Sequence, residues 1–93
     1  VEFIHEADEF VEEGIALYLD GELEEAEEKY LAALERRPDD PAALYNLGVL
    51  LRVAGRRQDA RIRFEEAAKC DPEHPDVRRA AEALERLNRR RDL

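Results

Sequence analysis

Apolar residues recur every three or four positions along most of the chain, which is the spacing of one face of an α-helix. The first such stripe begins close to the start of the sequence and consists of Phe3, Ala7, Phe10, Gly14 and Leu17. Its position predicts a helix that begins near Glu2 and ends near Leu19. Apolar and polar residues do not alternate as they would in a half-buried strand, so the pattern predicts an all-α protein.

Glycine, proline and aspartate residues mark the ends of further helices. Asp40 has the side chain of a helix N-cap and Pro41 follows it, in the first turn, where a missing N–H costs nothing. Gly55 is expected to end that helix in the left-handed conformation, and Pro38 is expected to stop the helix before it. Together these signals predict five helices, over about residues 2–19, 22–36, 41–54, 58–69 and 75–91.

The chain repeats itself when it is shifted by 34 residues. The matching pairs are Gly14 with Gly48, Leu17 with Leu51, Gly21 with Gly55, Ala26 with Ala60, Tyr30 with Phe64, Ala33 with Ala67 and Pro38 with Pro72. Small, aromatic and chain-breaking residues in register at one offset indicate two copies of one helix pair. The two units cover about residues 7–40 and 41–74. The last segment, about 75–91, has Glu82 in place of the glycine and is interpreted as a closing helix.

Two of the repeated glycines lie inside helices, where glycine costs about 1 kcal/mol relative to alanine. We expect each of them to let the next helix approach closely, with Gly14 facing Ala26 and Gly48 facing Ala60. Large side chains around such a contact can interlock as ridges in grooves. Burying each large apolar side chain contributes about 1.5–3 kcal/mol, which outweighs the loss of helix propensity.

This pattern resembles the tetratricopeptide repeat (TPR) family. The second unit follows the family pattern through Leu44, Leu47, Gly48, Leu51, Ala60, Phe64, Ala67 and Pro72. The first follows it through Phe10, Gly14, Leu17, Ala26, Tyr30, Ala33 and Pro38, and departs from it at Glu13, where an apolar residue is usual. The resemblance implies one domain over residues 1–93, an α-solenoid in which antiparallel helix pairs form a right-handed superhelix. The last helix resembles the solvating helix of the family.

In this family the first helix of each repeat lines a concave groove that holds a peptide or a helix of a partner protein. Residues of these helices that are not needed for packing are expected to face the groove. From the first helix they are Asp8, Val11, Glu12, Ile15, Tyr18 and Leu19; from the third, Ala42, Tyr45, Asn46, Val49, Arg52 and Val53; from the last, Asp76, Arg79, Ala83 and Arg86. The predicted partner-binding set is Val11, Ile15, Tyr18, Tyr45, Asn46, Val49, Arg52, Arg79 and Ala83.

The predicted function is therefore that of a protein–protein interaction module, part of an adaptor or scaffold. Three alternatives stay open: the apolar stripe is covered by the chain's own Val1–Ile4 segment, it pairs with a second copy in a self-association domain, or the chain is a fragment of a longer TPR array. The clamp that some family members use for chaperone carboxylate tails is not expected, because it needs cationic and amide donors. The corresponding positions hold Val11, Ile15, Asn46, Asp76 and Ala80, of which only Asn46 fits.

The residue types needed for chemistry are scarce. The sequence has no Ser and no Thr, one Cys and 2 His. Cys70 is alone, so neither a disulfide nor a zinc site is predicted, and it is expected to be a small buried hydrophobe. Pairing it with His74 would leave the histidine without an orienting group, and His5 is isolated. We therefore predict no catalytic residue, no metal and no cofactor.

Charge is distributed unevenly along the chain. Residues 1–40 carry 15 acidic and 3 basic side chains, whereas residues 41–93 carry 9 acidic and 12 basic ones. Because the acidic half repels phosphate, nucleic acid and membrane partners are not expected; only Arg89–Arg91 would argue for an RNA contact. Three interpretations of this uneven charge stay open. The charges form a solvated surface, the acidic half contacts a basic partner, or copies of the chain contact each other head to tail. An export signal and a long apolar run are not apparent, which predicts a soluble, cytoplasmic protein.

Overall fold

The computed structural model describes the backbone of residues 2–92 and the side chains of residues 6–89. This part of the chain forms five α-helices: α1 (Glu2–Leu19), α2 (Leu23–Arg36), α3 (Pro41–Val53), α4 (Arg57–Ala68) and α5 (Pro75–Asp92). Each bound lies within one residue of its prediction. The all-α prediction is confirmed, and the described residues contain no strand.

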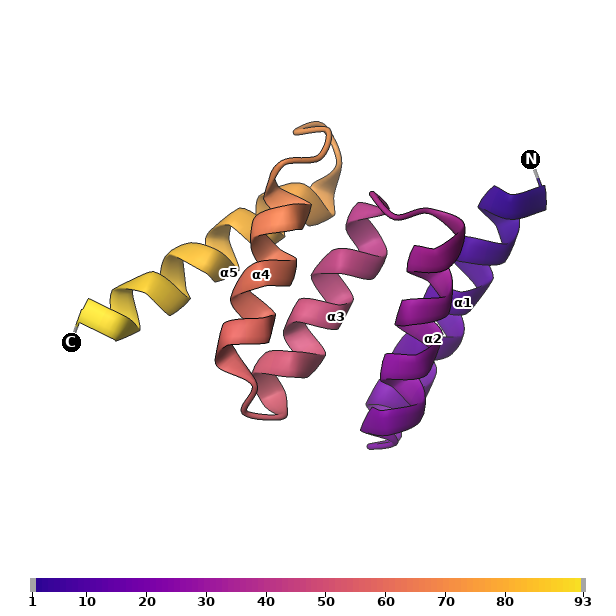
Figure 1. The fold of residues 1–93 in the computed structure, drawn as a ribbon, viewed down its shortest axis with the longest axis horizontal. Coiled ribbons are helices and arrows are strands. Elements are labelled where there is room, and N and C mark those ends of the chain that lie inside the picture. Colours follow the sequence, from indigo (N-terminus) through magenta and orange to yellow (C-terminus); the bar gives the residue numbers. More distant parts are fainter. Residues whose placement is uncertain (1, 93) are drawn as a thin grey trace.

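The helices form two layers (Figure 1). α3 contacts both α1 and α5, so these three helices are neighbours in one layer. α2 and α4 form the other layer, each packed against the helices that precede and follow it. Every helix therefore contacts its successor in the chain, which is the arrangement of stacked antiparallel pairs that the 34-residue offset predicts.

The two short turns within the helix pairs have the same structure. Gly21 and Gly55 have φ angles of +84° and +85°, in the left-handed region that favours glycine. The N–H of Glu22 donates to the carbonyl of Leu17 at 2.9 Å, and the N–H of Arg56 donates to that of Leu51 at 2.8 Å. These are Schellman bonds, which satisfy the last carbonyls of a helix. The role predicted for Gly55 is confirmed.

Asp40 begins the second repeat. Its Oδ1 accepts a hydrogen bond from the N–H of Ala42 at 3.1 Å, and the residue is only 3% exposed. Pro41 follows in the first turn of α3, so the predicted cap is confirmed. This cap satisfies a donor that the helix itself leaves unpaired, and it fixes the point at which α3 leaves the turn after α2.

Each helix glycine lies against an aromatic ring rather than against an alanine. A Cβ at position 48 would lie 2.5 Å from Cε1 of Phe64, and one at position 14 would lie 2.5 Å from Cε1 of Tyr30. Both positions therefore leave room for a hydrogen atom only. Gly48 was expected to face Ala60, which is buried in the same core; the atoms nearest to a Cβ at position 48 are those of the Phe64 ring.

One core runs through both repeats and into the closing helix. Its largest fully buried side chains are Tyr30, Leu47, Leu50 and Phe64. The same cluster includes three residues of α5, Ala80, Ala83 and Leu87. The last helix therefore packs one side into the core that the two repeats share.

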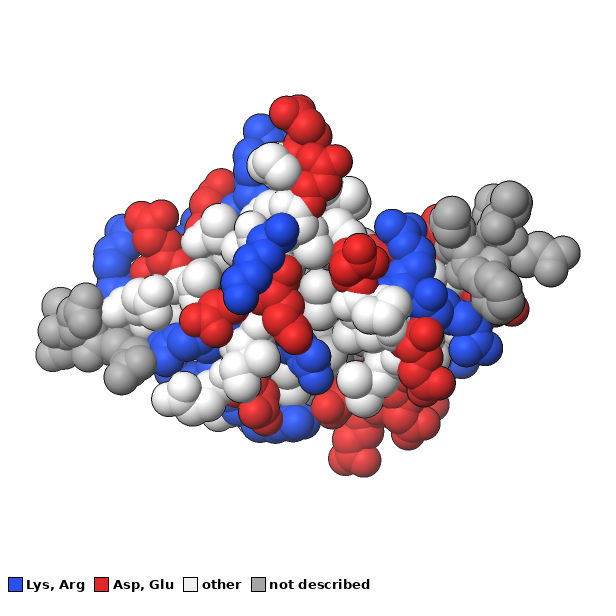
Figure 2. Space-filling view, turned by 45° about the horizontal axis from the view of Figure 1, so that its top comes forward, with Lys and Arg blue, Asp and Glu red and all other residues white. Residues whose placement is uncertain are grey.

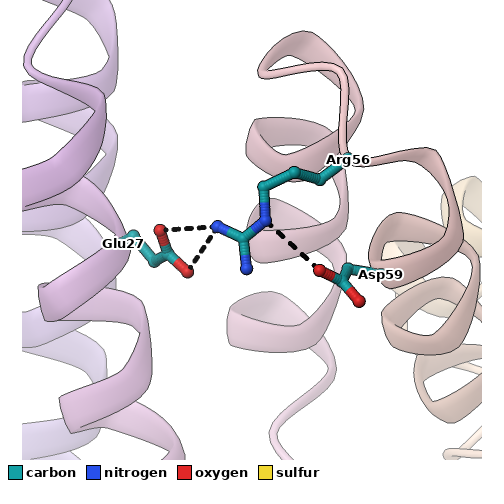
Figure 3. A network of polar contacts seen from close by, with 3 residues as sticks. All are labelled: Glu27, Arg56 and Asp59. Carbon is teal, nitrogen blue, oxygen red and sulfur yellow. Dashed lines mark hydrogen bonds and ion pairs between the residues drawn. The ribbon is translucent and has the colours of Figure 1, made fainter.

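Arg56 links the two repeats across the outer layer (Figure 3). Its Nη1 donates to both carboxylate oxygens of Glu27 on α2 at 3.1 Å, and its Nε donates to Asp59 in the first turn of α4 at 3.2 Å. Among the described residues, α2 and α4 themselves have no Cα atoms within 8 Å of each other. The hydrogen bond and charge of Glu27, followed by those of Asp59, raise the pKa of the guanidinium above its ordinary value.

The contact at Gly48 predicts that Gly48→Ala destabilises the protein, although alanine favours helix by about 1 kcal/mol. Overpacking a core costs about 1–3 kcal/mol, so we expect a net loss of about 1 kcal/mol or more in the free energy of unfolding, measured by urea denaturation. Adding Phe64→Leu should recover part of the Gly48→Ala loss in a double-mutant cycle. A Gly48→Ala protein that is more stable than the wild type would contradict this contact.

The Arg56 link predicts a salt-dependent contribution to thermal stability. Glu27→Gln should lower Tm in low salt, and the difference from the wild type should shrink as NaCl screens the charges. Glu28→Gln is the matched control, because it removes the same charge from a neighbouring exposed residue that forms no ion pair with a described side chain. Equal salt dependence of both variants would show that Glu27 has no specific role.

Candidate functional site

Two parallel rows of residues line the layer that contains α1 and α3. The row on α1 is Asp8, Glu12, Ile15 and Leu19, and the row on α3 is Ala42, Asn46, Val49 and Val53. Each α1 residue precedes its α3 counterpart by 34 positions. The spacing places all four residues of a row on one side of their helix, away from the glycines that face the outer layer. We call these two rows the inner face.

The inner face is apolar where α1 and α3 end. Leu19 is 76% exposed and Val53 is 56% exposed. Ile15 and Val49 are half-buried, and both pack against the core cluster with one side. Single exposed apolar residues are common on protein surfaces, but here the same two positions of both repeats carry apolar side chains that are exposed or half-buried. We call these four residues the apolar end; a gathering of this kind is typical of interaction sites.

The nine residues of the predicted binding set lie at different depths. The half-buried ones are Ile15, Tyr18, Tyr45, Asn46, Val49 and Arg52, and Arg79 is exposed. Val11 and Ala83 are only 6% and 3% exposed, so they have almost no surface to offer a partner. Their assignment to the groove is corrected here. Val11 packs into the cluster formed by α1, α2 and α3, and Ala83 lies on the side of α5 that covers the core.

Tyr45 and Arg52 flank the inner face and contact the ring of Phe64 on α4. The ring centroids of Tyr45 and Phe64 are 6.0 Å apart, and the Arg52 guanidinium carbon lies 5.8 Å from the centroid of Phe64. Both side chains therefore rest partly on the buried ring, which orients them. Asn46 is also oriented, because its Nδ2 donates to the carbonyl of Ala42 at 2.8 Å. The amide oxygen of Asn46 is left to accept a hydrogen bond.

The family profile described as Tetratricopeptide repeat matches residues 11–75, more than two thirds of the chain. The chain belongs to the tetratricopeptide repeat family. TPR domains generally mediate protein–protein interactions and are typically not catalytic. A comparison with curated proteins gives no match. None of the helices in residues 2–92 combines the length and apolarity needed to span a membrane.

The N-terminal segment continues the first TPR helix. The backbone of residues 2–4 belongs to α1, whereas Val1 lies outside the described residues. A segment that folds back over the inner face would have to leave the helix, so the alternative in which Val1–Ile4 covers the groove does not fit this backbone.

Negative charge on the TPR inner face comes from α1. Asp8 and Glu12 are exposed and form no ion pair with a described basic side chain. On α5, by contrast, Arg79 pairs with Asp76 at 2.8 Å. Figure 2, which views the molecule mainly from the side of α2 and α4, shows acidic side chains gathered at the lower right, at the end where α1 passes into α2, and both signs interspersed over α4 and α5.

A separate hollow of about 410 Å³ lies between the turns that precede α3 and α5. It contains Cys70, which is half-buried rather than buried as expected, with its Sγ 3.4 Å from the carbonyl oxygen of Asp39. Burial, followed by nearby carboxylates, raises the pKa of the Cys70 thiol, which disfavours the reactive thiolate. His74 accepts a hydrogen bond from the N–H of Asp76 at Nδ1, at 3.1 Å. These contacts are packing and helix capping.

The outer TPR layer has a notch, lined by both apolar and charged residues, that sequence reasoning missed. Leu31 and Ile62 are 39% and 51% exposed, and with Leu47 and Leu51 they line a hollow of about 170 Å³. A comparison of the repeats could have found it, because the counterparts of Leu31 and Ile62 are both glutamates. The Arg56 link across the notch was also missed, since Glu27 is 29 residues away from Arg56 in the sequence.

Tyr30 connects the site to the core and provides a pH test. Burial, and next the neighbouring Tyr18, raises the pKa of Tyr30 to about 12 from 10.0. Because the folded state holds this proton more tightly, its contribution to stability is complete below pH 10 and is lost as pH rises towards 12. We expect Tyr30→Phe to remove that loss, measured as urea stability between pH 9 and 12. Tyr18→Phe should leave most of it, because burial is the larger cause.

Proposed function

We propose that this chain is a protein-binding module whose inner face holds a peptide or a helix of a partner protein, as part of an adaptor or scaffold. The supporting observation is the apolar end, formed by Ile15, Leu19, Val49 and Val53 at repeat-equivalent positions. Removing such surface from water contributes about 25 cal/mol per Å². Binding energy at interfaces is concentrated in a few central apolar and aromatic contacts, and Tyr45 lies beside this set.

The proposed binding unit is the whole chain as one domain, with repeats at about 7–40 and 41–74 and a closing helix at about 75–91. The reason is the shared core: α3 packs on both α1 and α5, and the cluster that contains Tyr30 also contains Leu87. The two rows of the inner face therefore sit on helices that are fixed against each other. A rigid surface lowers the entropic cost of binding.

Self-association is the second candidate function, and the notch on the outer layer favours it. Leu31 and Ile62 expose apolar surface between charged residues, and this surface belongs to a layer that the first candidate does not use. Sedimentation equilibrium distinguishes the two: self-association through the notch should disappear in Ile62→Glu. A wild-type chain that stays monomeric at high concentration would exclude it.

The binding proposal predicts that Val49→Glu weakens peptide binding by about tenfold or more, equivalent to about 1.4 kcal/mol, with little change in helicity. The measurement starts from a random displayed-peptide library selected on the immobilised wild type, followed by anisotropy titration of the enriched peptides. Ile62→Glu is the matched control, because it places the same charge on the outer layer and should leave affinity unchanged.

Val49 packs partly on the core, so Val49→Glu could weaken binding by unfolding the protein. A second variant therefore tests binding at a residue outside the core. Val53→Gln changes a residue that is 56% exposed and should also weaken binding without altering Tm. If the library yields no peptide whose binding depends on Val49 or Val53, the inner face is not the binding site.

A further inference from the structure

We infer that the segment bound on the inner face is an apolar segment with basic residues confined to one end, and that this basic end lies against Asp8 and Glu12. The inference rests on the proposed function, because it describes the occupant of the same surface. It follows from the polarity of the α1 row, from the charges that surround it and from the position of Arg52.

The row on α1 changes character along the helix. Ile15 follows Asp8 by seven residues, and Leu19 follows Glu12 by seven residues. Seven residues are about 10 Å along a helix axis. The carboxylates are exposed at one end of the row and the apolar side chains stand at the other. A ligand that satisfies both must therefore carry its charged and apolar groups about 10 Å apart, which is about three residues in an extended peptide or about two turns in a helix.

The charge near the first end is negative and is not neutralised by neighbouring helices. Two of the basic side chains of α2 already have partners on α1: Lys29 pairs with Glu13 at 3.2 Å, and Arg36 pairs with Glu6 at 2.8 Å. Asp8 and Glu12 form no ion pair with any described side chain. Complementary charges at an interface raise the association rate and select the partner, so these carboxylates favour lysine or arginine and disfavour acidic ligands.

Arg52 prevents a uniformly basic ligand from binding equally well. It lies one residue before Val53 on α3, at the level of the apolar end, and its guanidinium is held over the ring of Phe64. It forms no ion pair with a described carboxylate. A lysine or arginine in the apolar part of a ligand would meet this positive charge, whereas an apolar side chain would not. Arg52 therefore disfavours a basic residue in the part of the ligand beside Val53, and the inferred position of the basic residues is the end near Asp8 and Glu12.

The experiment uses three synthetic peptides of equal length that share one apolar half. The other half carries lysines, glutamines or glutamates at the same positions, and a fourth peptide has the composition of the lysine peptide with its charges spread evenly. We expect the lysine peptide to bind about tenfold more tightly than the glutamine peptide in low salt, and more tightly than the spread peptide. The advantage should shrink in high salt. The glutamate peptide should bind most weakly.

Matched variants separate the inner face from the general acidity of the protein. Asp8→Asn/Glu12→Gln should abolish the preference for lysine over glutamine. Glu28→Gln/Glu35→Gln removes the same charge from exposed residues of α2 in the outer layer and should retain the preference. Equal losses in the two double variants would overturn the assignment, because the preference would then reflect net charge.

The outcomes also separate this inference from the proposed function. If the lysine, glutamine and glutamate peptides bind equally, and Val49→Glu weakens all three, the inner face is the binding site but the charge assignment is wrong. If none of the peptides binds, the charge assignment is also wrong. The proposed function is then decided by the library selection, which makes no assumption about ligand charge.

Discussion

The contact between a helix glycine and an aromatic ring determines the spacing of both helix pairs. At Gly14 and at Gly48, a Cβ would lie 2.5 Å from a ring carbon of Tyr30 or Phe64. The ring can fill the space only because the glycine has no side chain. Close packing of the ring outweighs the lower helix propensity of glycine. The ring of Phe64 then supports Tyr45 and Arg52, so the contact that closes the second helix pair also positions one edge of the inner face.

Local signals in the sequence predicted the helices. The contacts between helices and the burial of residues at helix edges depend on longer-range geometry, which the sequence pattern does not contain. Glycine, proline and the apolar period act within a few residues, which is why all helix ends were predicted within one residue. Which atom lies over Gly48 depends on the side-chain direction of Phe64, and the offset alone does not contain it. The burial of Val11 and Ala83 was not predicted. Whether a residue at the edge of a helix face is buried depends on the orientation of the neighbouring helices. Arg56 connects residues far apart in sequence, where no periodicity operates.

The two layers give the chain two chemically different surfaces. The outer layer carries ion pairs and a small notch, and the inner layer carries an acidic end and an apolar end. Both surfaces have the same origin. Residues that are not needed for the shared core can differ between the two repeats. Glu65 and Glu28 stand opposite Leu31 and Ile62 in the repeat comparison, whereas Ile15 and Val49 stay alike. Similar residues in both repeats make one continuous surface, and different residues make a local feature.

For the proposed binding site, the closing helix also limits the area that a ligand can cover. α5 buries Ala80, Ala83 and Leu87, the positions that would have extended the inner face by a third row. A footprint of two rows buries a small area, and small interfaces release their ligands quickly. Such contacts suit reversible exchange, and they reach high occupancy when several are tethered together, because the second binding event is then intramolecular. In the proposed complex, the helix that completes the core would also limit the area of the interface.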